Sequence, residues 1–485
     1  MIYKIKLLIV FSLVFLTIQS ALSQSEYEIN LNNLDIQEIP LSFVSNNNGE
    51  FAGIVSEENE SKDYYIYLID NEGDISKELF TKTDTAFRIT DIIHINSEPS
   101  GYLVTGNGFA LADGPDKYLT FFIRIDESLN VIWEKVYHFD YYYYGLLQSE
   151  MEEPNGDLLY CCTPEGPYMF LFRMSANGDS LKFRQYEGNE SGAVWSITYN
   201  NDSSNILIHT RGADGPFTTE CEILKLDQDW NQIGIADYTW NFLPPFTAKL
   251  LPNGKILTCG SKLIGMGEQY ISAYLMDENL SIQHEFYLNN TDTTSTSAAS
   301  ISVDYYGSNT FIGGNFDLYY HPNRSRDPSW YYITKVDDTL GTIYEKYIGG
   351  DASYWLYSIA ASPDGGVLLA GTREELTNDT IQFDGYLIKL DANGCITSLD
   401  GNINVNIKDA LVYPNPGTDK LKIRTALKKC EFNLYDETGK LVINYNIVSR
   451  QTTLPVDELK SGKYIYTISS ENRIVESGKW FKVNK

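Results

Sequence analysis

Histidine and cysteine are scarce in this chain, with 5 His and 6 Cys among 485 residues. The cysteines are irregularly spaced, without a Cys-x-x-Cys pair or paired Cys/His ligands, which excludes the common zinc and redox motifs. A complete Asp-x-[Asp/Asn]-x-[Asp/Asn]-Gly calcium loop is also missing. We therefore expect no metal site and no cofactor, and six cysteines leave fifteen full disulfide pairings open.

Catalytic signatures are missing too. The sequence has no Gly-x-Ser-x-Gly elbow, no His-Glu-x-x-His, no P-loop and no Gly-x-Gly-x-x-Gly opening a helix. His94 and His209 fall inside apolar segments, where a packed histidine is more common than a ligand. We predict no catalytic residue, so an enzyme is not the expected class. The alternative is a glycosidase-like pair of carboxylates, which the sequence cannot select among 56 candidates before residue 406.

Long apolar runs are confined to the start of the chain. Lys4 and Lys6 precede the mostly apolar stretch Leu7–Ile18, and Ala21-Leu22-Ser23 forms a small-x-small cleavage site. The alternative, a membrane anchor, needs about 20 apolar residues, more than this run supplies. We interpret residues 1–23 as a signal peptide and expect no membrane-spanning segment in the mature chain.

Positive charge is also in short supply, because the whole chain has a net charge of −28. Residues 406–485 contain 14 Lys and Arg against 9 Asp and Glu, and the signal peptide adds two positive charges, so residues 24–405 carry −35. Such an acidic body repels phosphate backbones, and nucleic acid is therefore excluded as a partner. A strong negative charge is typical of a soluble extracellular protein.

A 3.6-residue apolar period is absent, whereas 36 Tyr and frequent Gly, Asn and Asp clusters indicate strands and turns. One strand-and-turn pattern recurs seven times. Its strand-ending residue steps by 49 to 60 positions along Asp70, Asp126, Ser175, Asp227, Asp277, Asp337 and Asp391. This period predicts an all-β fold, a seven-bladed β-propeller over residues 24–400.

The seventh repeat has little sequence after its turn at Asn393-Gly394, whereas Tyr27–Leu31 precedes the first repeat as an isolated alternating strand. We predict that this N-terminal strand completes the seventh blade and thereby hides a sheet edge. The alternative is a six-bladed ring with an unrelated flank.

The last residues carry ordered motifs. Val412-Tyr413-Pro414-Asn415-Pro416 is followed by a Tyr-Asp-x-x-Gly-Lys turn, a Gly-x-Tyr segment and a closing Lys-Trp-Phe-Lys strand. These motifs resemble the type A C-terminal sorting domain of type IX secretion in Bacteroidetes-type bacteria. The resemblance implies an Ig-like β-sandwich at 410–485 after a linker at 401–409, the secretion machinery as partner, and a secreted or outer-membrane surface location. The sorting-motif residues are Pro414, Asn415, Pro416, Tyr435, Asp436, Gly439, Lys440, Gly462 and Tyr464.

The repeats themselves resemble delta-60/Kelch-like propeller repeats, through an Asp/Asn-Gly turn and a Lys-Leu-Asp strand end such as Lys389-Leu390-Asp391. The resemblance implies a fold and no particular activity.

Aromatic residues gather in the predicted blade links and in the long loop at 316–330, on one face of the predicted ring. Loops on a rigid scaffold often bind ligands, and aromatic and Arg side chains dominate binding sites. We predict a non-catalytic module for an extracellular glycan or protein ligand; alternatives are the carboxylate-pair enzyme acting on polysaccharide, a structural surface component, and simple packing between blades. The predicted ligand-binding residues are Tyr142, Tyr143, Trp195, Trp240, His321, Arg324, Arg326, Trp330 and Trp355.

Overall fold

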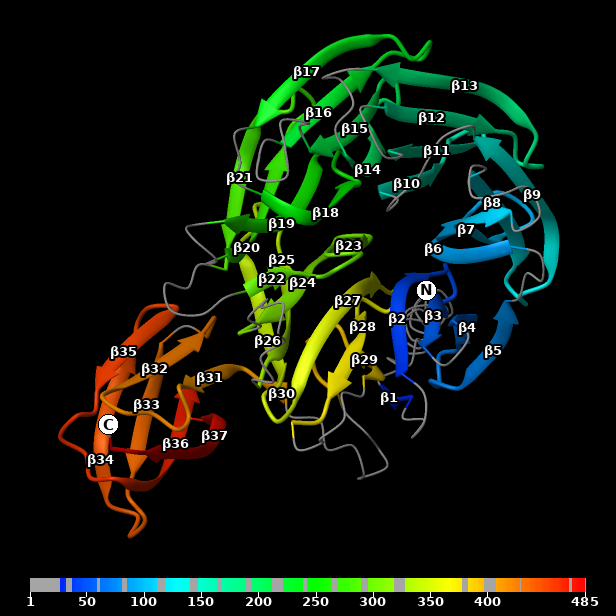
Figure 1. The fold of residues 1–485 in the computed structure, drawn as a ribbon. Coiled ribbons are helices and arrows are strands. Elements are labelled where there is room, and N and C mark those ends of the chain that lie inside the picture. Colours follow the sequence, from blue (N-terminus) through cyan, green and yellow to red (C-terminus); the bar gives the residue numbers. More distant parts are fainter. Residues whose placement is uncertain are drawn as a thin grey trace, which may run out of the picture.

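The computed structural model describes residues 27–31, 37–58, 62–80, 85–110, 118–139, 147–163, 168–187, 193–211, 221–238, 242–263, 269–288, 295–317, 328–376, 383–396, 407–427, 429–470 and 473–484. All regular elements in these ranges are β-strands. Seven antiparallel sheets precede the C-terminal region and stand side by side around a ring (Figure 1). The part of the chain before residue 400 is therefore a propeller-like all-β structure.

The first three sheets each use four consecutive strands. Their strands are β2 (Gln37–Ser45), β3 (Phe51–Glu58), β4 (Lys62–Ile69) and β5 (Ile75–Phe80); β6 (Thr85–Ile95), β7 (Gly101–Ala110), β8 (Tyr118–Asp126) and β9 (Val131–Phe139); and β10 (Leu147–Glu152), β11 (Leu158–Thr163), β12 (Tyr168–Met174) and β13 (Ser180–Glu187).

The fourth and fifth sheets repeat this order, and the sixth departs from it. They contain β14 (Ala193–Tyr199), β15 (Ile206–Arg211), β16 (Cys221–Leu226) and β17 (Gln232–Tyr238); β18 (Phe242–Leu250), β19 (Ile256–Leu263), β20 (Gln269–Met276) and β21 (Ile282–Tyr287); and β22 (Ser295–Ser297), β23 (Val303–Tyr306), β24 (Asn309–Phe316), β25 (Trp330–Val336), β26 (Thr342–Gly349) and β30 (Ile407–Lys408). The innermost strand of the sixth sheet is thus split into β22 and β23, which both pair with β24.

The seventh sheet joins the two ends of the ring. It contains β27 (Ser353–Ala361), β28 (Val367–Glu374), β29 (Asp384–Leu390) and, on its outer side, β1 (Tyr27–Asn30). Antiparallel pairing places Tyr27 opposite Lys389 and Asn30 opposite Tyr386. The predicted closure by the N-terminal strand is confirmed, and it buries Tyr27 in a cluster with Ile69 and Leu387.

Turn chemistry explains the regular strand-ending Asp. In the second sheet Asp126 Oδ1 accepts the backbone N–H groups of Ser128 and Asn130, at 2.9 and 2.8 Å. The same side-chain contacts recur after Asp227, Asp277, Asp337 and Asp391, while Ser175 Oγ accepts the N–H of Asp179 in the third sheet. A short acceptor at this position satisfies backbone donors that the turn leaves unpaired.

The C-terminal region contains two sheets that share one hydrophobic core. Strands β31 (Ala410–Tyr413), β32 (Lys420–Thr425) and β35 (Gln451–Pro455) form one sheet; β34 (Leu441–Ile447), β33 (Cys430–Tyr435), β36 (Gly462–Ser470) and β37 (Arg473–Lys482) form the other. Residues 407 and 408, which were expected in the linker, instead form β30 and pair with β26 of the sixth sheet.

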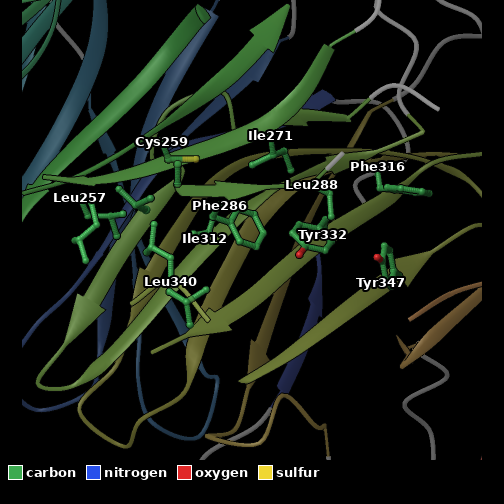
Figure 2. Close-up of a cluster of buried hydrophobic side chains, with 14 of the residues drawn as sticks. Leu257, Cys259, Ile271, Phe286, Leu288, Ile312, Phe316, Tyr332, Leu340 and Tyr347 are labelled. Carbon is green, nitrogen blue, oxygen red and sulfur yellow. The ribbon is translucent and has the colours of Figure 1, made fainter. Parts of the chain in front are cut away.

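Hydrophobic clusters fill the spaces between neighbouring sheets. The largest extends from the fifth sheet through the sixth to the C-terminal region, and Figure 2 shows Leu257 and Leu340 at one end with Phe316 and Tyr347 at the other. Four cysteines, Cys161, Cys162, Cys259 and Cys430, are buried in strands and form no disulfide in the described part of the chain, as expected for small apolar side chains.

Candidate functional site

The innermost strands of the ring surround a cavity of about 900 Å³. Residues of β2, β6, β10, β14, β18, β23 and β27 line it, so every one of the seven sheets contributes. Figure 1 shows these strands facing the middle of the ring. The cavity is therefore axial, and its volume falls in the range of small-molecule sites, roughly 300–1,000 Å³.

A ring of hydroxyl side chains connects these innermost strands. Six of the seven sheets have Ser or Thr at the same register position: Ser42, Ser149, Ser196, Thr247, Ser302 and Ser358. The hydroxyls mostly bond the strand of the next sheet; for example, Ala248 N–H donates to Ser196 Oγ at 3.2 Å. In the second sheet this position is Asp91.

The next position along each innermost strand is apolar in six sheets, as Phe43, Ile92, Ile197, Ala248, Val303 and Ile359, and is Glu150 in the third. The two exceptions to the repeat lie in adjacent sheets, and Asp91 and Glu150 are hydrogen-bonded to each other. Both line the axial cavity. Two independent departures from the repeat that meet at one place indicate a specialised position.

The surroundings give the two carboxyl groups different protonation. Glu150 Oε1 accepts from Thr105 Oγ1 at 2.5 Å and from Gln148 Nε2 at 2.7 Å. Burial, and then the negative charge of Asp91, raise the pKa of Glu150 well above its usual value. Burial also raises the pKa of Asp91, but donation from Ser42 Oγ (2.8 Å) and from the Ile92 N–H (2.9 Å) opposes this.

One shared proton between Glu150 and Asp91 follows from these contacts, because two adjacent carboxylates cannot both ionise at low cost. Glu150 Oε2 is buried and accepts no hydrogen bond from any donor that the structure describes, which fits a carboxyl oxygen that carries the proton. The pair thus presents one acid and one carboxylate beside the cavity.

Aromatic and amide groups supply the rest of the wall. Trp195, Tyr305 and Tyr357 line the cavity together with Asn107 and Gln148. The two amides are linked by Asn107 Nδ2 donating to Gln148 Oε1 at 2.8 Å. This combination of flat aromatic surfaces and fixed polar groups suits a polar organic ligand.

Two of the predicted aromatic residues lie at or next to this cavity. Trp195 lines it, and Trp355 stacks on cavity-lining Tyr357 with ring centroids 6.2 Å apart. Trp330 lies elsewhere, against Phe316 at 6.0 Å and partly buried in the largest hydrophobic cluster. Six predicted residues lie outside the described ranges: Tyr142, Tyr143, Trp240, His321, Arg324 and Arg326.

The C-terminal motif residues hold that region together. Trp480 Nε1 donates to the Pro414 carbonyl at 2.8 Å, and Asn415 bonds the backbone of Lys479 and Phe481 in β37. Asp436 accepts from the N–H groups of the turn that contains Gly439 and Lys440, and Tyr464 packs on Trp480. Pro416 lies between β31 and β32, and Gly462 is the first residue of β36.

No cluster of three or more potential metal ligands occurs in the described part of the chain. His209 is buried in β15, and burial lowers its pKa to about 3. No helix among the described residues is long and apolar enough to cross a membrane.

Sequence reasoning missed Asp91 and Glu150. The signal was present in the repeat, because an alignment of the seven innermost strands shows Asp and Glu where the other copies have hydroxyl and apolar residues. The contact between them needed the structure, since it depends on which sheets are neighbours and on the strand register.

Comparison with known proteins identifies the C-terminal region. Residues 411–482 match the family model of the secretion system C-terminal sorting domain. The chain therefore carries a type IX sorting domain, and the protein is secreted or attached to the outer-membrane surface. No curated protein matches the chain.

Solved structures resemble the chain only distantly. A protein of unknown function from Dyadobacter fermentans has 11% identity and a TM-score of 0.45, covering 75% of this chain and 97% of its own. PorZ, a surface component of the type IX secretion system of Porphyromonas gingivalis, has 11% identity and a TM-score of 0.28, with coverages of 92% and 81%. A subtype N11 neuraminidase-like protein of A/flat-faced bat/Peru/033/2010 (H18N11) has 10% identity and a TM-score of 0.37, with coverages of 61% and 85%. Such low similarity carries no functional argument.

Proposed function

We propose that the seven sheets are the blades of a seven-bladed β-propeller, that the sorting domain is an Ig-like sandwich, and that the exported propeller is a non-catalytic binding module. The axial cavity takes the ligand, and a glycan fits it best. One observation carries this proposal: the innermost strands of all seven sheets enclose one cavity that has both aromatic and polar walls. A concave site of this size suits a sugar better than a broad protein surface.

The cavity wall has the groups that sugars require. The rings of Trp195 and Tyr357 offer flat apolar surfaces, and Asn107 with Gln148 offers donors and acceptors for hydroxyl groups. Thr198 Oγ1, which also belongs to a cavity-lining residue, is buried without a hydrogen-bond partner in the described part of the chain. A ligand hydroxyl would satisfy it, which gives a bound sugar a further contact.

The binding test is a glycan array followed by titration calorimetry on the full-length protein. Replacing Trp195 or Tyr357 by Ala removes an aromatic contact worth about 1–3 kcal/mol, so binding should weaken about tenfold or more. Phe183→Ala is the control, because Phe183 is an exposed aromatic on the outer strand β13, away from the cavity. Equal affinity for all three variants would place the ligand elsewhere, as on the loop face predicted from the sequence with Arg324 and Arg326.

The runner-up function is a polysaccharide-degrading enzyme that uses Asp91 and Glu150, because the pair supplies an acid and a carboxylate beside a cavity. The spacing argues against it: retaining glycosidases hold their carboxyl groups about 5–5.5 Å apart and inverting ones about 6.5–9.5 Å, whereas these two are in direct contact. Reducing-sugar release by the wild type that disappears in Glu150→Gln would favour the enzyme over the binding module.

A further inference from the structure

Strand β26 of the sixth sheet differs from the outermost strands of the other sheets. Strand β5 is exposed along almost its whole length, whereas β26 is buried over its last five residues. The second and sixth sheets allow a matched comparison, because Glu134-Lys135 in β9 and Glu345-Lys346 in β26 stand at the same distance after the strand-ending Asp. Glu134 is exposed, but Glu345 is buried. The C-terminal sorting domain covers β26, as Figure 1 shows.

Arg450 of the sorting domain neutralises the buried Glu345. Its guanidinium pairs with the Glu345 carboxylate, donates to Tyr332 Oη at 3.0 Å, and lies over the Phe286 ring at 5.4 Å. The Glu345 side chain is 0% exposed. Such a carboxylate is tolerated because it is paired and also accepts from Tyr332 Oη and Tyr347 Oη, and removal of Arg450 would take away its ion pair.

Arg424 makes a second contact of the same kind. Its Nε donates to Tyr347 Oη at 2.8 Å, and its guanidinium lies over Phe316 at 5.5 Å. Tyr413 of the sorting domain belongs to the same hydrophobic cluster and packs edge-on against the Phe316 ring at 6.1 Å; Figure 2 labels Phe316. Both arginines therefore insert among aromatic rings of the fifth and sixth sheets, where guanidinium groups are well accommodated.

A backbone ladder and an ion pair complete the contact. Strand β30 adds to the edge of β26, with Ile348 opposite Ile407, and Lys346 Nζ lies 2.5 Å from Asp409 Oδ1. The net charges agree with these contacts, since the basic C-terminal segment lies against a body with a charge of −35.

We propose that the outer face of the sixth sheet is a dedicated docking surface for the sorting domain, and that the two parts remain bound as a non-covalent complex after the chain between them is cut. The partner that this surface fits is an arginine-bearing β-sandwich, supplied here by the same chain. This inference is independent of the cavity and its ligand.

The test uses the full-length protein with a protease recognition sequence inserted between residues 397 and 406. After cleavage, both fragments should co-elute in size-exclusion chromatography at physiological salt. The double variant Arg424→Ala/Arg450→Ala should separate at least about 100-fold faster, because truncating one partner of a buried charge pair mainly accelerates dissociation. Arg473→Ala is the matched control, an exposed arginine of the same domain, and should co-elute like the wild type.

Immediate separation of the cut wild-type fragments would overturn the proposal, as would a double variant that stays together as long as the wild type. If the double variant fails to fold, hydrogen exchange on the cut wild type decides instead. The amides of β26 should stay as protected as in the uncut protein, and exchange as fast as those of β5 would contradict docking.

Discussion

Acidic residues occupy two opposite kinds of position in this protein. At the turns, partly exposed carboxylates such as Asp126 accept the Asn130 side-chain amide and backbone N–H groups, and these hydrogen bonds lower the pKa of Asp126. Inside the ring, burial raises the pKa of Glu150 instead. The first kind was predictable, because a turn needs an acceptor wherever it occurs in the repeat. The second kind depends on neighbours from another sheet, which local sequence does not specify.

Glu150 should make stability depend on pH. Its folded-state pKa is raised, so the native protein holds a proton that the unfolded chain releases above its ordinary value of about 4.3. The stabilisation is complete below that value and is lost as pH rises through the folded-state pKa. Glu150→Gln keeps the shape and removes the titration, so the variant should gain stability relative to the wild type as pH rises above about 4.3, until Glu150 ionises in the folded protein.

Urea unfolding at several pH values measures this difference. The titratable group beside Glu150 is Asp91, whose pKa burial raises and the positive charge of Lys249 lowers. The other two contacts of Glu150, from Thr105 and Gln148, are uncharged donors. Glu38 and Glu476 have pKa values raised to about 7 and are present in both proteins, so their contributions cancel in the comparison. Parallel stability curves for wild type and Glu150→Gln would show that Glu150 is ionised in the fold.

At the scale of strands, the repeat predicted the order of elements well. Each strand-ending Asp, and Ser175 in the third repeat, lies at or directly after the third strand of its sheet, and β1 completed the seventh sheet as expected. The split of the sixth innermost strand into β22 and β23, and the burial of β26, were not predictable. Both depend on contacts across sheets or with the sorting domain, and a strand pattern records only the two faces of its own sheet.

Deleting residues 27–31 should destabilise the ring by about 3 kcal/mol or more, because the pairing with β29 is lost and the apolar contacts of Tyr27 disappear. Thermal unfolding of the otherwise full-length mature chain measures the effect. Tyr27→Phe is the control and should leave the melting temperature unchanged. The Tyr27 hydroxyl is buried without a hydrogen-bond partner among the described residues, and phenylalanine keeps the aromatic side chain. An unchanged melting temperature after the deletion would mean that β1 contributes nothing to closure.

At the scale of the whole molecule, the sorting domain was predictable from the sequence, whereas its contact with the body was not. The terminal motifs were recognisable because they occur in a fixed order, and their structural reason is now visible in contacts such as Trp480 with Pro414. No comparable signal for the docking of this domain is visible in the sequence, because Arg424 and Arg450 resemble any other surface arginine until their partners in the sixth sheet are known.

Removing residues 410–485 should abolish export across the outer membrane and leave the body in the periplasm, because the sorting domain is the signal that the secretion machinery reads. Cell fractionation with immunoblotting measures the location. Arg473→Ala in the full-length chain serves as the control and should be exported normally. Surface delivery of the truncated body would show that another segment directs export.

The pairing of β1 with β29 also has a consequence for the order of folding. The first described strand finds its partner only after nearly the whole ring has been synthesised, since Tyr27 pairs with Lys389. An open array of repeats can fray from either end, but a ring fastened in this way has no terminal repeat to lose first. We therefore expect the seven sheets to melt in one cooperative transition. The last step of folding should be the pairing of β1 with β29 of the seventh sheet.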